Sequence, residues 1–142
     1  MRDNLPDIQE LVKLSHNYLR QGKYQQLIDI QTQILEALPG NAGALKLRAM
    51  SFSKQGKYKE AILDCTQLIE TLNSQSQPSL ARYLATLEVN LEQELYNVYL
   101  ERGLYFCCLK NFNSGIKDFE KAKSFCATPE VESLLAQALA NA

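Results

Sequence analysis

Apolar side chains recur along this chain at the three- and four-residue spacing of an amphipathic α-helix, with helix-breaking turns between the runs. The spacing holds from Leu11 to Tyr18, stops at Gly22, and resumes up to Leu38, where a Pro-Gly-Asn turn follows. Two short helices joined by a tight turn cover each other's apolar stripes when they pack antiparallel. The pattern therefore predicts a helix hairpin over residues 8–41.

The same arrangement occurs a second time in the sequence. The segment Tyr18–Tyr24 ends in Gln-Gly-Lys-Tyr, and so does Phe52–Tyr58, 34 residues further along the chain. A fixed period of this size indicates stacked helical units, none of which buries its apolar face alone. We set the first unit at 8–41 and the second at 42–75.

A third unit is predicted at 96–129, although Lys110 takes the place of the turn glycine. Thr128 before Pro129 has the form of an N-cap with proline at the first helical position. An apolar stripe follows, so we expect a final helix at 129–141 that shields the last hairpin from water.

An insertion, 76–95, separates the second and third units. Leucines at helical spacing run through it without a helix breaker, which predicts one long helix from about Ser79 to about Leu109. The row of leucines on this helix must be buried against another surface. That surface is either the protein's own repeats, with a bend near Asn90 as one variant, or a second copy of the chain. The leucines that would make such a homodimer contact are Leu80, Leu84, Leu87 and Leu91.

The three units resemble the tetratricopeptide repeat (TPR) family, whose unit has small residues at positions eight and twenty and aromatic residues at eleven and seventeen. Leu27 at position twenty and Asn73 in place of a proline are departures. The resemblance implies an all-α solenoid of antiparallel helix pairs, with three repeats, a lengthened first helix in the third and a C-terminal capping helix. The matching residues are Ser15, Tyr18, Gly22, Tyr24 and Pro39 in unit one, Ala49, Phe52, Gly56, Tyr58 and Ala61 in unit two, and Gly103, Phe106, Phe112, Gly115 and Ala122 in unit three.

The resemblance also implies a concave groove lined by the first helix of each unit. One end of this groove is predicted to be basic and the other apolar, which suits a peptide or helix with acidic residues toward units one and two and an aliphatic residue toward unit three. Ordinary surface charge is the other interpretation of its basic residues. The predicted groove residues are Val12, His16, Leu19, Arg20, Lys46, Met50, Lys54, Leu100 and Leu104, with Cys107 and Cys108 beyond them.

Co-chaperones of this family hold a C-terminal Asp carboxylate with a five-residue clamp of Lys, Asn and Arg side chains. The positions that match the clamp carry Val12, His16, Leu47, Asn97 and Glu101. Leu47 offers no hydrogen bond to a carboxylate, and Glu101 would repel one. We therefore predict no binding of chaperone tails.

Charge and composition point to a protein partner. Fifteen Lys and Arg against sixteen Asp and Glu give a formal charge of −1, which favours neither nucleic acid nor an anionic membrane. No apolar run is long enough to cross a bilayer, and the N-terminus lacks the apolar segment of a signal peptide, so we expect a soluble cytoplasmic protein.

No motif predicts catalysis, a metal site or a cofactor. His16 has no nucleophile at motif spacing, and the adjacent Cys107 and Cys108 would diverge on a helix. Cys65 and Cys126 fall on predicted core stripes. We predict a non-enzymatic adaptor, scaffold or chaperone-like module that binds a peptide or helix, with structural homodimerisation through the inserted helix as the alternative.

Overall fold

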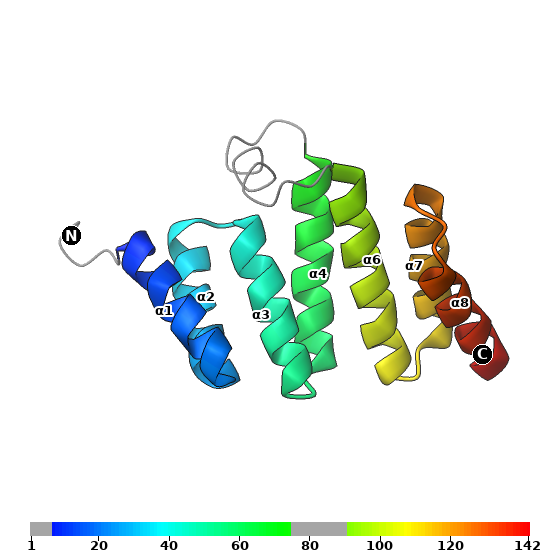
Figure 1. Cartoon of the computed structure of the whole chain (residues 1–142), viewed down its shortest axis with the longest axis horizontal. Helices are drawn as coiled ribbons and strands as arrows, with labels where there is room; N and C mark the ends of the chain where they lie inside the picture. Colours follow the sequence, from blue (N-terminus) through cyan, green and yellow to red (C-terminus); the bar gives the residue numbers. More distant parts are fainter. Residues whose placement is uncertain (1–6, 75–90) are drawn as a thin grey trace.

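The computed structural model describes residues 7–74 and 91–142, and these form seven α-helices and no strand (Figure 1). Successive helices pack as antiparallel hairpins, α1 with α2, α3 with α4 and α6 with α7, and α8 packs against α7 at the end of the row. The predicted all-α array of hairpins with a capping helix is confirmed. The helices are α1 Ile8–Gln21, α2 Tyr24–Ala37, α3 Ala42–Lys54, α4 Tyr58–Asn73, α6 Leu91–Cys108, α7 Phe112–Phe125 and α8 Pro129–Asn141.

The hairpin turns depend on one residue each in the left-handed backbone region. Gly22 and Gly56 have φ of 68° and 76°, which glycine adopts without strain. Lys110 occupies the same place in the third turn with φ of 62°, where a Cβ atom is unfavourable. The predicted cap of α8 is confirmed, because the backbone N–H of Val131 donates to Thr128 Oγ1 at 3.1 Å.

Small residues let α6 and α7 approach closely. A Cβ atom on Gly103 would lie 2.6 Å from the ring of Phe119, and one on Gly115 would lie 2.6 Å from Cys107 Sγ. Both distances are too short for real contacts, so the phenyl ring fills space that any other residue at position 103 would occupy. The sequence places small residues at this helix crossing for that reason.

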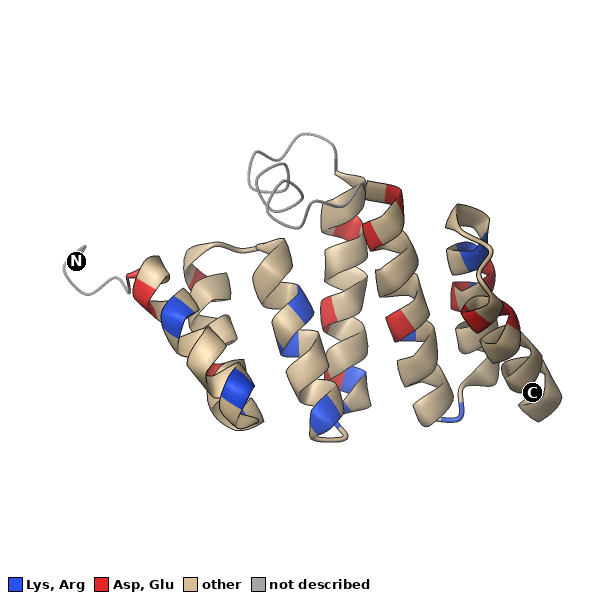
Figure 2. Cartoon of the chain, viewed as in Figure 1, with Lys and Arg blue, Asp and Glu red and all other residues tan. Residues whose placement is uncertain are grey.

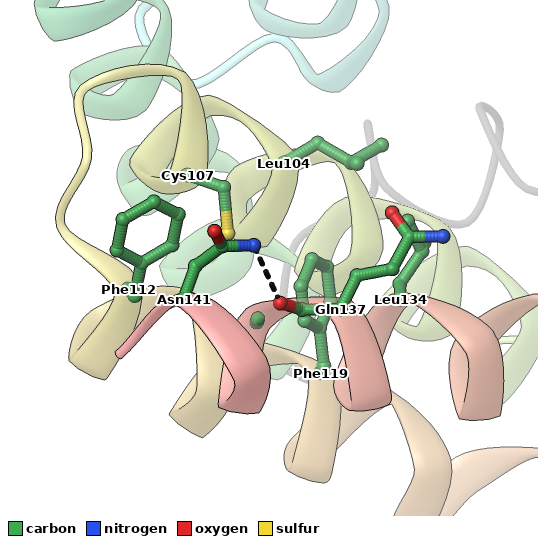
Figure 3. A pocket seen from close by; sticks show the side chains of 8 residues that line it. Leu104, Cys107, Phe112, Phe119, Leu134, Gln137 and Asn141 are labelled. Atoms are coloured by element: carbon green, nitrogen blue, oxygen red, sulfur yellow. Dashed lines mark hydrogen bonds between the residues drawn. The ribbon is translucent and has the colours of Figure 1, made fainter.

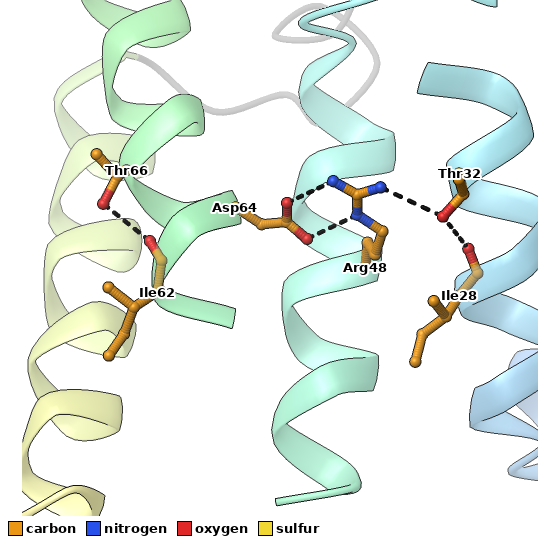
Figure 4. Close-up of polar contacts among 6 residues, drawn as sticks. All are labelled: Ile28, Thr32, Arg48, Ile62, Asp64 and Thr66. Carbon is orange, nitrogen blue, oxygen red and sulfur yellow. Dashed lines mark hydrogen bonds and ion pairs between the residues drawn. The ribbon is translucent and has the colours of Figure 1, made fainter. Parts of the chain in front are cut away.

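A partly buried arginine ties each later hairpin to the one before it, and Figure 4 shows the first of these, Arg48. Arg48 on α3 donates two hydrogen bonds to the Asp64 carboxylate on α4, at 2.8 and 2.7 Å, and a third to Thr32 Oγ1 on α2, at 3.2 Å. In the third hairpin, Arg102 makes the same three bonds, to Asp118 on α7 and to Thr66 on the preceding α4. Bidentate charged bonds of this kind fix orientation as well as adding energy.

The described part of the predicted long helix packs against the protein itself. Leu95 is buried in the core around α4, and Leu91 is partly buried against that core. Residues 79–90, which include Leu80, Leu84 and Leu87, lie outside the described residues. Self-association through those three leucines therefore stays a prediction.

The cysteine prediction is half right. Cys65 is buried in the core as expected, whereas Cys126 is exposed. The reason is that α7 ends at Phe125, and Cys126 is its extended C-cap residue, outside the helical periodicity that was used to place it.

Candidate functional site

The first helix offers accessible groove residues. Val12 and Leu19 on α1 are 42% and 38% exposed, and His16 and Arg20 are also exposed. Arg20 donates a hydrogen bond to Asn17 one turn earlier, which leaves the rest of its guanidinium facing solvent. This end of the predicted groove thus presents apolar and basic groups together.

The middle of the predicted groove is less basic than the sequence indicates. Lys46 on α3 donates to Glu94 Oε1 on α6 at 2.9 Å, and the Glu94 side chain is only 1% exposed. Glu101 lies on the same helix, where burial raises the pKa of its carboxyl group, Lys46 lowers it and Glu94 raises it further. Lys46 therefore compensates carboxylates of its own chain, while Met50 stays half-buried and Lys54 exposed.

At the other end of the predicted groove, Leu100 is buried and Leu104 lines a pocket. Leu100 is 8% exposed and packs within the core around α6, α7 and α8, so the prediction that it contacts a ligand is corrected. Leu104, one turn further along α6, lines a pocket of about 160 Å³ between α6, α7 and α8 (Figure 3). The lining residues are Leu104, Cys107, Phe112, Phe119, Leu134, Gln137, Ala138 and Asn141.

The pocket has an apolar interior and an amide rim. Phe119 lies at its base, between the α6 side chains and those of α8. Burial raises the pKa of the Cys107 thiol, so this group stays neutral and behaves as a small hydrophobe. Asn141 Nδ2 donates to the backbone carbonyl of Gln137 at 2.8 Å, which holds one rim amide in place. An apolar cavity of about 150 Å³ takes a benzene-sized group, so an aliphatic or phenyl side chain fits here.

Sequence reasoning missed most of this pocket because α8 was predicted only as a cover for the last hairpin. Gln137 stands where a packed helix pair needs a small residue, and that mismatch was the available signal. Gln137 is exposed on α8 and lines the opening of the pocket.

Nothing in the described residues gathers into a catalytic or metal centre. His16 makes no hydrogen bond there to a serine, cysteine or carboxylate, and no cluster of three or more His, Cys, Asp or Glu could hold a metal ion in residues 7–74 and 91–142. Over the same residues, no helix combines the length and the apolar character that a membrane crossing requires.

Comparison with solved structures identifies the fold. The chain is similar to the first TPR domain of Spaghetti (RPAP3) bound to the HSP90 peptide SRMEEVD, with a TM-score of 0.69 and 21% identity over 95% of this chain and 94% of that one. It is also similar to the second TPR domain of human RPAP3 in complex with the HSP70 peptide SGPTIEEVD, with a TM-score of 0.68 and 23% identity over 90% and 91%.

A third similar structure is the TPR2B domain of yeast Sti1 in a complex with pHsp70, with a TM-score of 0.72 and 15% identity over 95% of this chain and 98% of that one. No family model and no curated protein matches the sequence. At these identities the likeness establishes the fold, which is that of TPR domains.

Proposed function

We propose that this chain, which has the fold of TPR domains, is a non-enzymatic adaptor or chaperone-like module that binds a polypeptide segment of a partner in its concave groove. The observation that carries the proposal is the apolar pocket between α6, α7 and α8, next to the predicted groove residue Leu104. Ligand pockets of this kind combine an apolar interior with a few polar groups that orient the ligand.

The pocket suits one aliphatic or phenyl side chain of the bound segment. The rim amides of Gln137 and Asn141 can hydrogen-bond the backbone that carries this side chain. On α1, the exposed Val12 and Leu19 offer further apolar contact at the other end of the groove. The bound segment would therefore be anchored at unit three and extend toward unit one.

The partner is expected to differ from the acidic chaperone tails that the similar domains bind. Leu47 and Glu101 stand at positions where the family's clamp carries hydrogen-bond donors. Glu101 lies partly buried beside Glu94, so a carboxylate brought to this place would meet two acidic groups and one lysine that already compensates them. We expect the groove not to bind the peptide SRMEEVD.

Selection of peptides from a random display library against the purified chain tests the proposal. We expect the selected peptides to share an aliphatic or phenyl side chain, and to lose binding to a Gln137→Trp variant, because Gln137 is exposed at the pocket rim and an indole would fill the opening. Ala140→Trp is the matched control, since Ala140 is exposed on the same helix and does not line the pocket.

Equal binding of the selected peptides by both tryptophan variants would contradict the proposed site. Thermal unfolding of the two variants checks that the fold is intact. Sedimentation of the intact chain distinguishes peptide binding from homodimerisation, the other predicted role, because a homodimer would form without any added peptide.

A further inference from the structure

The three hairpin turns lie on one edge of the array, the lower edge in Figure 2, and that edge is basic. We define the turn edge as the three turns with one helical turn on either side, which comprises residues 18–27, 51–61 and 105–115. Glu60 is the only acidic residue in these segments. The basic residues are Arg20, Lys23, Lys54, Lys57, Lys59 and Lys110, and all six are exposed.

The opposite edge has the reverse charge. Three of its acidic side chains pair with lysines, Glu10 with Lys13, Glu94 with Lys46 and Glu132 with Lys123, and acidic residues outnumber basic ones there. The chain's formal charge of −1 therefore hides two edges of opposite sign, separated by roughly 20 Å, the length of a 14-residue helix. The acidic residues of the opposite edge are Asp7, Glu10, Glu36, Glu70, Glu92, Glu94, Glu130 and Glu132.

Helix stability does not explain the turn lysines. Lys23 and Lys57 are the N-cap residues of α2 and α4 and make no side-chain capping bond, although Asp, Asn, Ser and Thr serve far better there. Their positive charge also opposes the helix dipole, which favours acidic groups at an N-terminus. Lys110 stands at φ of 62°, where the other two turns have glycine. Each turn thus carries a lysine at a locally unfavourable place.

These cations are also available to a ligand. The ion pairs in residues 7–74 and 91–142 involve Lys13, Lys46, Arg48, Arg102 and Lys123, and none of the six turn-edge bases takes part in one. Exposed bases in a row without intramolecular ion pairs form a favourable surface for an anionic chain.

We propose that the turn edge is a second binding surface, separate from the groove, and that its ligand is a short Asp- or Glu-rich segment of a partner polypeptide. A long polyanion such as RNA gains little from a distance, because salt screens the turn-edge charges beyond a Debye length of about 10 Å and the whole chain carries a formal charge of −1. A short acidic segment lying across the turns instead contacts Lys23, Lys57 and Lys110 directly.

The test is a variant that removes the charge while favouring the fold, Lys23→Asp with Lys57→Asp. Asp is a preferred N-cap, so the midpoint of thermal unfolding should stay the same or rise. We expect its affinity for a labelled Glu-rich peptide, measured by fluorescence anisotropy at low salt, to be about tenfold weaker than that of the parent chain. A Lys23→Arg, Lys57→Arg variant should retain binding, and added salt should weaken it.

The control with the same change in net charge is Lys13→Glu with Lys121→Glu, which alters exposed lysines away from the turns and should weaken binding far less. Three results would overturn the proposal: no binding by the parent chain, equal loss in both double variants, or tighter binding of a single-stranded RNA of matched length. Gln137→Trp should leave this affinity unchanged, so the result is independent of the groove.

Discussion

The first and third hairpins share one backbone layout but fill the crossing between their helices in opposite ways. In the first, Gln31 Nε2 donates to Ser15 Oγ at 2.6 Å, and both side chains are buried. In the third, the same two positions carry Gly103 and Phe119, and the ring occupies the space beside the glycine. One crossing is held by a buried hydrogen bond and the other by close apolar packing.

The hairpins differ again in the arginine that joins units. Leu14 and Ile30 stand in the first hairpin where the third has Arg102 and Asp118, and Leu14 is 38% exposed. No helix precedes α1 among the described residues, so an arginine at position 14 would lack the kind of threonine partner there that Arg102 finds on α4. The comparison indicates that the repeat pattern determines the path of the helices, while the residues that fill each crossing differ from one helix pair to the next.

The largest expected effect is at the third crossing. Phe119→Ala removes a fully buried ring and should lower the free energy of unfolding by about 3–5 kcal/mol. Gly103→Ala should cost about 1–3 kcal/mol, because its Cβ atom would lie 2.6 Å from the ring. Urea unfolding followed by circular dichroism measures both.

Combining the two substitutions tests whether the pair acts as a unit. Once the ring is gone, the added methyl group of Gly103→Ala enters vacated space, so the double variant should be no less stable than Phe119→Ala alone. Additive losses would show that the glycine is required for some other reason.

A smaller loss is expected from breaking the arginine bridges. Asp118→Asn and Asp64→Asn each remove a buried carboxylate that accepts two bonds from an arginine, and each should cost about 2 kcal/mol, reduced from a fully buried pair because the arginines are partly exposed. Unfolding curves should show similar losses for both variants. Glu132→Gln, in the exposed pair with Lys123, should cost well under 1 kcal/mol.

Much of this architecture is predictable from sequence, because a 34-residue period and glycines at the turns constrain helix number and order directly. The arginine bridges were overlooked although Arg48 and Arg102 recur at the same repeat position. The pocket is harder to predict from the sequence, since it depends on the distance between α8 and α6, and no local pattern encodes that distance. The burial of Leu100 likewise depends on α8, which covers a face that the periodicity alone assigns to the groove.

At the first crossing, the stability of the fold should depend on a buried hydrogen bond. Removing one partner of this bond should therefore cost more than removing both. Ser15→Ala leaves the buried amide of Gln31 without its acceptor and should cost about 1–2 kcal/mol. Adding Gln31→Leu removes the unsatisfied group and should restore most of the stability. If Ser15→Ala alone is harmless in urea unfolding, the bond contributes nothing, and the contrast between the two crossings fails.

The smallest effect concerns position six of each unit, which holds the exposed Lys13 in the first hairpin and the partly buried Glu101 in the third. Burial, with Glu94 adding to it and Lys46 opposing it, raises the pKa of Glu101 in the folded state. Between the unfolded pKa of about 4.5 and the raised folded pKa, the folded protein binds more protons than the unfolded chain, so this carboxyl group lowers stability as pH rises through that window. Glu101→Gln removes that penalty, so the variant should be more stable than the parent at pH 7, and the difference should disappear below about pH 4. Thermal unfolding at several pH values measures this difference in stability.

Lys13→Gln is the control and should show no such pH-dependent difference. A difference for Glu101→Gln that stays constant with pH would mean that the titration of Glu101 is not the cause.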